Sequence, residues 1–329
     1  MTWPSPPGTS ITEGPLSPER AAQIEELAAV ATRADGVAPL SEDALLHVRH
    51  GVNDHGVNDH GVNDHGVNDQ SGARDLVLTA DNGTLAGYAH LDAPDAGAQD
   101  GDASGELVIH PGHRGRGYGT ALVEALLGGQ DEVGVRLWSH GELPGAVALA
   151  KAAGFTRFRA LWQLRMPLAQ VPDADPLLPP GVVVRTFAVG KDEEAWLAVN
   201  ARAFAHHPEQ GSWTRADVEL REAEPWFDPA GFFLAERDGR LLGFHWTKVH
   251  PDGGADGGPI GEVYVVGIDP GQQGGGLGRA LTQVGLAHLR RRGLADVLLY
   301  VDEDNTAAVR MYTALGFGRW STDAMYRHP

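Results

Sequence analysis

Residues 261–283 read GEVYVVGIDPGQQGGGLGRALTQ and pass from a strand through a glycine-rich loop into a helix. Glu262–Ile268 is rich in β-branched and aromatic residues, which predicts a buried strand, and Asp269-Pro270-Gly271 ends it with turn residues. The apolar spacing from Arg279 to Arg291 predicts an amphipathic helix. The glycines therefore lie at a helix N-terminus, where unpaired backbone N–H groups and the helix dipole favour a pyrophosphate.

The glycine loop resembles the phosphate-binding motif of one enzyme superfamily. It lacks the Gly-Lys-Ser/Thr ending of a Walker loop, and a dinucleotide fingerprint needs a parallel βαβ unit with a following acidic residue. From Gln273 to Gly278 it is similar to Q/R-x-x-G-x-G/A, with which the GNAT acyltransferases bind the pyrophosphate of acetyl-CoA. Asn305–Phe317 resembles the N-x-x-A-x-x-x-Y-x-x-x-G-F signature of the same superfamily, in the expected order.

The first half of the chain repeats the features of the second. Arg114, Gly117 and Gly119 follow the same R-x-x-G-x-G pattern, and Gly154-Phe155 repeats the later ending Gly316-Phe317. Both halves show helices, a hairpin, a strand, the loop with its helix, another strand and helix, and a final strand. We therefore predict an α/β fold (an α+β mixed sheet) with two tandem GNAT domains at 1–170 and 181–329, joined by a proline-rich linker at 171–180.

The composition of the chain argues against several classes of binding partner. The chain has 329 residues and a net charge of −18, which argues against nucleic acid or an anionic membrane as a partner. It contains no cysteine, so disulfides and thiolate metal sites are excluded, and we expect no metal. No signal sequence or long apolar run is present, which predicts a cytoplasmic protein. We also expect a monomer.

A low-complexity insert interrupts the first half. At 50–69 the unit His-Gly-Val-Asn-Asp occurs four times without variation. Its histidines and aspartates suggest a metal tract, but a five-residue repeat rich in glycine and Asn-Asp favours a flexible solvent loop instead. We interpret it as a loop.

Acyl transfer from a thioester to an amine needs a base, a donor to the carbonyl oxygen and a proton for the thiolate. Glu262 opens the strand that leads to the loop and is the predicted base, and Tyr312 is the predicted acid. The ordinary alternatives are a solvated glutamate and a half-buried packing tyrosine. In the first half, Ala103 and Ala150 align with these two positions. That half is predicted to bind acetyl-CoA without turnover, or to be a degenerate scaffold that binds nothing.

Longer stretches resemble sequences of the mycothiol synthase family. Members of this family are tandem GNAT enzymes that acetylate the cysteinyl amine of desacetylmycothiol. They include DGVAPLSE at 35–42, NARAFAHHPEQGSWT at 200–214 and LLYVDEDNTAAVRMY at 298–312. By this resemblance the substrate, a pseudodisaccharide thiol, would contact Glu42, Glu209, Lys248, Glu262 and Tyr300. The alternatives are a tandem GNAT enzyme for another small amine, such as an antibiotic or amino acid, and a non-enzymatic acyl-CoA sensor, which the presence of Glu262 and Tyr312 disfavours.

The resemblance also implies one coenzyme A site in each half. In the second half these residues are Val266, Gly267, Ile268, Gln273, Gly274, Gly275, Gly276, Leu277, Gly278, Arg279, Asn305, Thr306, Ala307, Ala308, Val309 and Arg310. In the first half they are Leu107, Val108, Ile109, Gly115, Arg116, Gly117, Tyr118, Gly119 and Thr120. The family commonly has basic residues inside the later loop, whereas this chain has only glutamine and glycine at 272–275. Backbone amides and Arg279 are therefore expected to hold the pyrophosphate, and a bulge is expected to splay the preceding strand.

Overall fold

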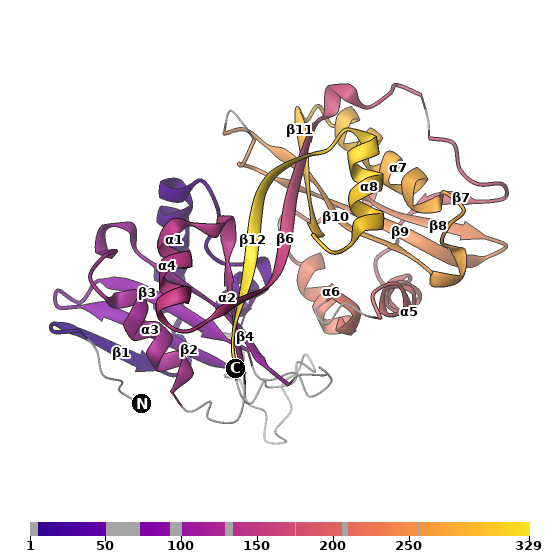
Figure 1. Ribbon diagram of the computed structural model, residues 1–329. Helices are drawn as coiled ribbons and strands as arrows, with labels where there is room; N and C mark the ends of the chain where they lie inside the picture. Colours follow the sequence, from indigo (N-terminus) through magenta and orange to yellow (C-terminus); the bar gives the residue numbers. More distant parts are fainter. Residues whose placement is uncertain are drawn as a thin grey trace, which may run out of the picture. The chain divides into compact units, whose positions relative to one another are not determined.

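The computed structural model describes residues 6–50, 73–92, 101–128, 134–174, 176–205, 210–254 and 257–329. The chain forms two compact units (Figure 1). The first unit comprises Met1–Ala160 and Thr322–Pro329, and the second comprises Leu161–Ser321. Apart from His50, the repeat at 50–69 lies outside the described residues, so its interpretation as a loop stays a prediction. Within those residues no helix has both the length and the hydropathy needed to cross a membrane.

The first unit is a mixed sheet with helices on both faces. Its elements are β1 (Thr9–Glu13), α1 (Pro18–Asp35), α2 (Glu42–His50), β2 (Arg74–Ala80), β3 (Leu85–Leu91), β4 (Ala103–Ile109), η2 (Pro111–His113), α3 (Tyr118–Leu127), β5 (Val135–Ser139), η3 (His140–Glu142) and α4 (Pro144–Ala152), completed by the end of β12 (Gly318–His328). The strand order is β1-β2-β3-β4-β5-β12, and the pairings are antiparallel except for parallel β4–β5.

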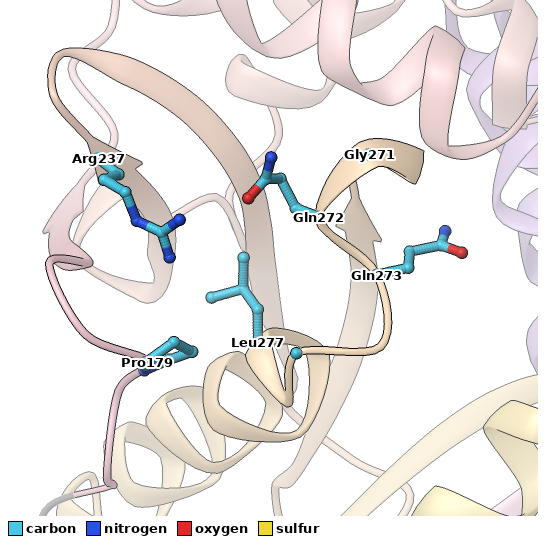
Figure 2. A pocket seen from close by; sticks show the side chains of 7 residues that line it. Pro179, Arg237, Gly271, Gln272, Gln273 and Leu277 are labelled. Carbon is cyan, nitrogen blue, oxygen red and sulfur yellow. The ribbon is translucent and has the colours of Figure 1, made fainter.

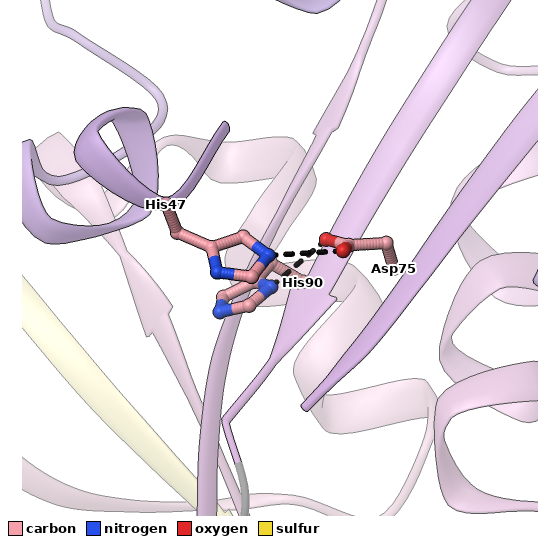
Figure 3. A group of neighbouring side chains, drawn as sticks. All are labelled: His47, Asp75 and His90. Atoms are coloured by element: carbon pink, nitrogen blue, oxygen red, sulfur yellow. Dashed lines mark hydrogen bonds and ion pairs between the residues drawn. The ribbon is translucent and has the colours of Figure 1, made fainter. Parts of the chain in front are cut away.

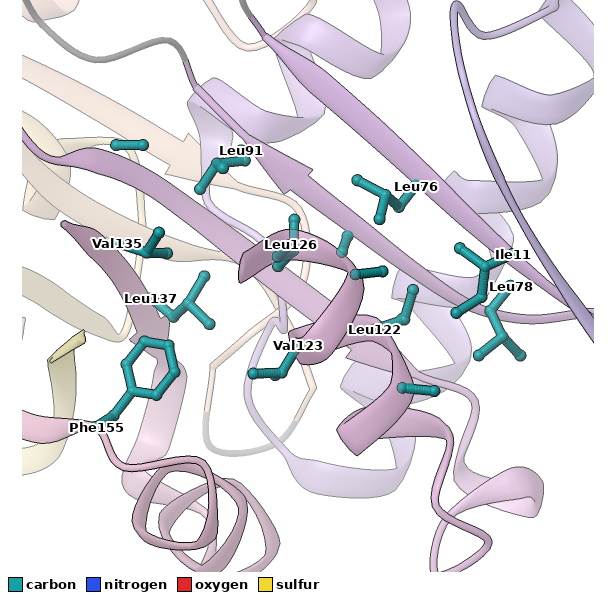
Figure 4. Close-up of a cluster of buried hydrophobic side chains, with 14 of the residues drawn as sticks. Ile11, Leu76, Leu78, Leu91, Leu122, Val123, Leu126, Val135, Leu137 and Phe155 are labelled. Carbon is teal, nitrogen blue, oxygen red and sulfur yellow. The ribbon is translucent and has the colours of Figure 1, made fainter. Parts of the chain in front are cut away.

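Two apolar layers hold the first unit together. Leucines of β2 and β3 pack against Leu122 and Leu126 of α3 on one face of the sheet (Figure 4). On the other face, residues of α1 and α2 pack against Val77, Tyr88 and Val108. The sheet alternates between these two layers because successive strand residues point to opposite faces.

The second unit repeats this plan. Its elements are β6 (Thr156–Pro167), η4 (Leu168–Gln170), β7 (Val183–Thr186), α5 (Glu193–Ala203), η5 (Gln210–Ser212), α6 (Arg215–Glu222), η6 (Pro229–Gly231), β8 (Phe232–Arg237), β9 (Arg240–His250), β10 (Ile260–Ile268), η7 (Pro270–Gln272), α7 (Leu277–Arg291), β11 (Asp296–Asp302) and α8 (Thr306–Leu315). The strand order is β6-β11-β10-β9-β8-β7, parallel only at β10–β11. Figure 1 shows α5 and α6 on one side of β8–β10, and α7 and α8 on the other.

Local sequence signals set the helix boundaries. Ser17 precedes α1 and accepts a hydrogen bond from the N–H of Arg20, as a capping hydroxyl should. Thr214 and Asp217 form a reciprocal capping box at the start of α6. The helices and strands together confirm the predicted α/β fold with a mixed sheet and a repeated plan in the two halves.

The final strand of each half is placed differently from the prediction. From Leu161 onward β6 pairs with β11 in the second unit, and Ala324–His328 of β12 pair with β5 in the first. The compact units are bounded at Ala160 and Ser321, and the domain ranges 1–170 and 181–329 stay predictions. The placement of the two strands results from backbone pairing between distant segments, which local sequence patterns do not specify. The assignment of cofactor binding and catalysis to separate domains stays a prediction.

Candidate active site

β10 is irregular next to Glu262, the predicted base. Its register with β9 shifts between Val263 and Val265, which leaves Tyr264 as an extra residue. Such a bulge bends a strand and interrupts its pairing. Within the described structure, the parallel pairing of β10 with β11 covers Gly261 and Glu262. β10 therefore carries the expected bulge, and its edge beyond Glu262 is released from β11.

The released edge of β10 presents backbone groups from alternate residues. The N–H of Asp269 donates to the carbonyl of Leu242 on the β9 side at 2.9 Å. Backbone groups alternate in direction along a strand, so those of Val266 and Ile268 point away from β9, whereas those of Gly267 point toward it. A β-carbon on Gly267 would also lie 2.6 Å from the Phe244 ring, so this position has no room for a side chain.

The loop after β10 forms a cradle at the start of α7. Gly274 and Gly276 have φ values of +81° and +82°, a conformation that favours glycine. Gly276 is the N-cap, so the N–H groups of Leu277–Arg279 have no acceptor inside the helix. A β-carbon on Gly274, Gly275 or Gly276 would meet no atom within 4 Å. The open space and the unpaired donors fit a pyrophosphate.

Asp269 fixes the entrance to this loop. Its carboxylate accepts hydrogen bonds from the N–H of Gly271 at 3.0 Å and from the guanidinium of Arg202 at 2.9 Å. Arg240 adds a contact at 3.3 Å. Burial opposes the charge, but the hydrogen bonds from Gly271 and Arg202 outweigh it and hold the pKa of Asp269 below its usual value.

A pocket lies beside the loop (Figure 2), lined by Pro179, Arg237, Gly271, Gln272, Gln273, Gly275 and Leu277. Gln272 and Gln273 project to opposite sides of the loop. Arg237 is the one cationic residue among these seven and comes from the end of β8. It supplies positive charge beside a loop of glutamines and glycines. Sequence reasoning missed Arg237, because only the β8–β9 hairpin brings it to the loop.

The first unit contains a loop of the same geometry. Gly115 and Gly117 have φ values of +73° and +81°, and Gly117 is the N-cap of α3. Arg114, which begins the motif, binds Asp35 through two hydrogen bonds of 2.6 and 2.7 Å. Arg116 is exposed on the same loop. The first loop thus offers backbone amides and Arg116 to a pyrophosphate, and their role in binding stays a prediction.

Further residues of the first site are placed by the pairing of β4. The N–H of His110 donates to β3 at Ala86, so the backbone groups of Leu107 and Ile109 point away from β3 and those of Val108 point toward it. Tyr118–Thr120 form the first turn of α3. A β-carbon on Gly119 would lie 3.0 Å from Leu149, so Gly119 serves helix packing as well as the loop.

Glu262 lies buried at the end of the β10–β11 ladder, with 6% of its surface exposed. Its Oε2 lies 2.7 Å from Nε2 of His250, at the end of β9. Glu262 pairs with Lys248 on β9 and with Leu298 on β11. Laterally paired residues share a sheet face, and so does Tyr300, two residues after Leu298. Lys248, Glu262 and Tyr300 therefore lie on one face of the second unit, as a shared substrate site requires.

The two other residues on this face have defined neighbours. Lys248 Nζ lies 4.2 Å from the centre of the Trp226 ring and 5.1 Å from that of Tyr264, which stabilises its charge. Tyr300 is 41% exposed, and its hydroxyl accepts a hydrogen bond from Gln163 Nε2 at 2.7 Å. His250 was missed in the sequence, although its position two residues after Lys248 on a strand places it on this same face.

Tyr312 lies on the opposite face of the sheet. It is buried on α8 among Val263, Leu286 and Phe317, and its ring centre is 5.7 Å from that of Phe317. Burial raises the pKa of Tyr312 to about 12, so its hydroxyl is a proton donor at neutral pH. The pairing of β10 with β11 ends at Glu262, so the two strands are no longer joined beyond that residue. Glu262 and Tyr312 thus lie on opposite faces of the sheet, and their roles as base and acid stay predictions.

The second signature forms the start of α8. Asn305 is the N-cap, and its Oδ1 accepts a hydrogen bond from the N–H of Ala308 at 3.1 Å. This leaves the NH₂ group of Asn305 for a ligand. Thr306–Arg310 form the first helical turns and are exposed or half-buried. Their N-terminal N–H groups suit an anion, although the role of each residue stays a prediction.

Two further residues are predicted to contact the substrate. Glu42 is the first residue of α2 in the first unit. Glu209 lies outside the described residues. Their contacts with substrate stay predictions.

Comparisons with known proteins agree with this geometry. The model of the acetyltransferase (GNAT) family matches residues 50–155 and 198–317. A mycothiol acetyltransferase of Thermobispora bispora is 58% identical over 303 residues, covering 92% of this chain and 93% of that protein. One of Streptomyces avermitilis is 50% identical, covering 99% and 97%.

Solved structures show the same fold. A tandem GNAT protein from the clavulanic acid biosynthesis pathway has a TM-score of 0.69 at 22% identity, covering 97% of this chain and 98% of its own. A GCN5-related N-acetyltransferase from Sphaerobacter thermophilus has a TM-score of 0.61 at 25% identity, covering 97% and 95%. With a cradle, a released strand edge and full-length relatives, the chain belongs to the GNAT acetyltransferases and, among them, to the mycothiol acetyltransferase family.

Proposed function

We propose that the protein transfers the acetyl group of acetyl-CoA to the cysteinyl amine of desacetylmycothiol, the last step of mycothiol biosynthesis. The observation that carries this proposal is the buried carboxylate of Glu262, hydrogen-bonded to His250 where the β10–β11 ladder ends. A base at that point reaches both the substrate face and the released edge of β10. The relatives named mycothiol acetyltransferase support the choice of substrate.

The site residues of the second unit then each have a role in the reaction. Acetyl-CoA supplies an activated acetyl thioester. Glu262 accepts a proton from the ammonium form of the substrate, directly or through water, and the free amine nitrogen then bonds to the thioester carbonyl carbon and releases its surplus proton to water. The N–H of Val266, which points away from β9, donates to the carbonyl oxygen as negative charge develops there. The carbon–sulfur bond breaks, and Tyr312 gives its proton to the departing thiolate.

The substrate face supplies recognition. Lys248 and Tyr300 offer a donor and a hydroxyl to the sugar and inositol hydroxyls. Glu42 and Glu209 are acceptors suited to hydroxyl or ammonium groups. His250 holds the Glu262 carboxylate by their 2.7 Å contact and is a positioning residue.

We also propose that the first unit binds a second acetyl-CoA without turning it over. Its loop has the same left-handed glycines as the second loop. The β4–β5 ladder covers Ala103, the residue aligned with Glu262, together with Ser104 and Gly105, and none of the three is acidic. The adjacent carboxylate, Glu106, accepts a 2.6 Å hydrogen bond from the N–H of Ser41, and α4 contains no tyrosine. A monomer in the cytoplasm remains our expectation.

Replacing Tyr312 with phenylalanine should lower turnover by about 10²-fold, because the thiolate then leaves without a proton donor. The raised pKa of about 12 keeps the wild-type hydroxyl protonated throughout the working range. Wild-type turnover should therefore show no loss from tyrosine ionisation between about pH 7 and about pH 10. Steady-state rates of both proteins over this range, with Tyr326→Phe in the first unit as the control, test this role. Normal turnover by Tyr312→Phe would make Tyr312 a packing residue.

Product analysis tests the proposed function itself. The protein is incubated with acetyl-CoA and either desacetylmycothiol, an aminoglycoside or a free amino acid, and the products are examined by mass spectrometry after thiol alkylation. We expect rapid acetylation of desacetylmycothiol, with a blocked amine and a free thiol. An S-acetylated product, or preference for another amine, would contradict the proposal. Binding of acetyl-CoA with no product from any amine would indicate a sensor.

A further inference from the structure

A second group of chemically active side chains lies in the first unit and takes no part in the proposed reaction. His47 of α2, Asp75 of β2 and His90 of β3 meet on the sheet face covered by α1 and α2 (Figure 3). One ligand atom from each lies within 4.8 Å of the other two. In the described part of the chain, this is the one cluster of histidine and carboxylate side chains with such spacing.

The distances are close to those of a metal site. Asp75 Oδ2 lies 2.9 Å from His47 Nε2, and Asp75 Oδ1 lies 3.0 Å from His90 Nδ1. Ligand atoms of a tetrahedral zinc site with bonds of about 2.0–2.1 Å lie about 3.3 Å apart. The two contacts with Asp75 are shorter than this by only a few tenths of an ångström, and all three ligand atoms lie within 4.8 Å of one another. The rings of His47 and His90 are already adjacent, with centres 4.2 Å apart.

Surrounding residues orient the ligands from outside. Asp92 Oδ1 lies 2.9 Å from Nε2 of His90, so it holds this ring with Nδ1 directed at the cluster. The hydroxyl of Tyr88 donates to Asp75 Oδ1 at 2.6 Å. Carboxylate partners of a ligating histidine and hydrogen bonds to a ligating carboxylate are regular features of metal sites. The two histidines and Asp75 thus have both the donor atoms and the support that a metal needs.

We propose that His47, Asp75 and His90 bind one divalent transition-metal ion of the zinc type, with water in the remaining position. Two imidazoles and a carboxylate suit zinc and its neighbours, and magnesium and calcium prefer all-oxygen sites. The ion joins α2 to β2 and β3. Because α2 begins at Glu42, a predicted substrate residue, the site fixes the helix that presents Glu42. It also replaces the expectation from the sequence that the protein needs no metal.

The test uses the full chain after chelator treatment, titrated with Co²⁺ and followed by visible absorption, and with Zn²⁺ followed by calorimetry. The histidines of the repeat are a competing source of ligands. The titrations are therefore repeated on a variant in which His50, His55, His60 and His65 are all replaced by glutamine. We expect one equivalent of Co²⁺ with the intense absorption of a tetrahedral site in both proteins, and a melting temperature that rises with Zn²⁺ concentration.

Two variants of the repeat-substituted protein separate the metal site from a purely structural cluster. His47→Gln should abolish the tetrahedral Co²⁺ spectrum. Asp92→Asn, at a side chain 53% exposed, should weaken Zn²⁺ binding by about 10–100-fold without unfolding the protein. His328→Gln is the matched control and should bind normally. Failure of the repeat-substituted protein to bind an equivalent of metal, or unchanged binding by folded His47→Gln and Asp92→Asn, would overturn the proposal and leave a metal-free hydrogen-bond network.

Discussion

The Glu262→Gln variant should acetylate desacetylmycothiol about 10²–10⁴-fold more slowly than the wild type at neutral pH, the range expected for loss of a positioned general base. Glutamine keeps the size of the side chain and its ability to hydrogen-bond with His250, so the buried site stays filled. It has no affinity for the proton that the amine must lose. Steady-state turnover at saturating concentrations of both substrates measures the effect.

Two controls make this result specific. Calorimetric titration should show that Glu262→Gln still binds acetyl-CoA, because the cradle at 273–279 is unchanged. Glu194→Gln, at a side chain 75% exposed on α5, should turn over normally. A wild-type rate in Glu262→Gln would remove Glu262 from the chemistry. A lost rate together with lost acetyl-CoA binding would assign it to binding.

The glycine loops allow a matched comparison between the two units. Gly117 and Gly276 both cap a helix with φ near +81°, and a β-carbon at either would meet no atom within 4 Å. Aspartate tolerates this backbone better than most residues and adds a negative charge where a pyrophosphate would lie. Gly276→Asp should raise the KM for acetyl-CoA by about 10²-fold or more, equivalent to about 2.7 kcal/mol of lost binding. Gly117→Asp should leave turnover unchanged.

Calorimetric titration with acetyl-CoA tests the same two variants by a second, independent measurement, the number of binding sites. We expect up to two acetyl-CoA sites in the wild type, with the first-unit site missing in Gly117→Asp and the second-unit site missing in Gly276→Asp. Loss of turnover in a folded Gly117→Asp protein would contradict the division between a binding unit and a catalytic unit. A single site that only Gly276→Asp removes would show that the first unit is an empty scaffold.

The glycine cradles could be predicted from sequence because their signal is local. Gly274 and Gly276 take up left-handed backbone and are followed at once by helical periodicity, so composition and order suffice. The position of Glu262 was predictable for the same reason. Its partner His250 was not, because their contact depends on the register of β9 against β10. Local patterns do not state which residues of two strands lie side by side.

Contacts between segments far apart in the chain could not be predicted from the sequence for a related reason. Leu161 opens a recognisable strand segment, but nothing near it shows that it pairs with Asp302 on β11. His47, Asp75 and His90 come from a helix and two strands, and only the packing of α2 on the sheet brings them together. Tyr312 was predicted from a motif, whereas its burial, which raises its pKa, depends on core packing.

The pH dependence of the Glu262→Gln defect tests the central claim most directly. A free α-amine has a pKa of about 7.7–8.0, so the substrate needs progressively less help from a base as the pH rises through that value. We measure single-turnover acetylation of desacetylmycothiol by wild type and Glu262→Gln from about pH 6.5 to about pH 9.5. If Glu262 is the base, the ratio of the two rates is largest at the acidic end and shrinks steadily toward the alkaline end. A ratio that stays constant across this range would contradict the account.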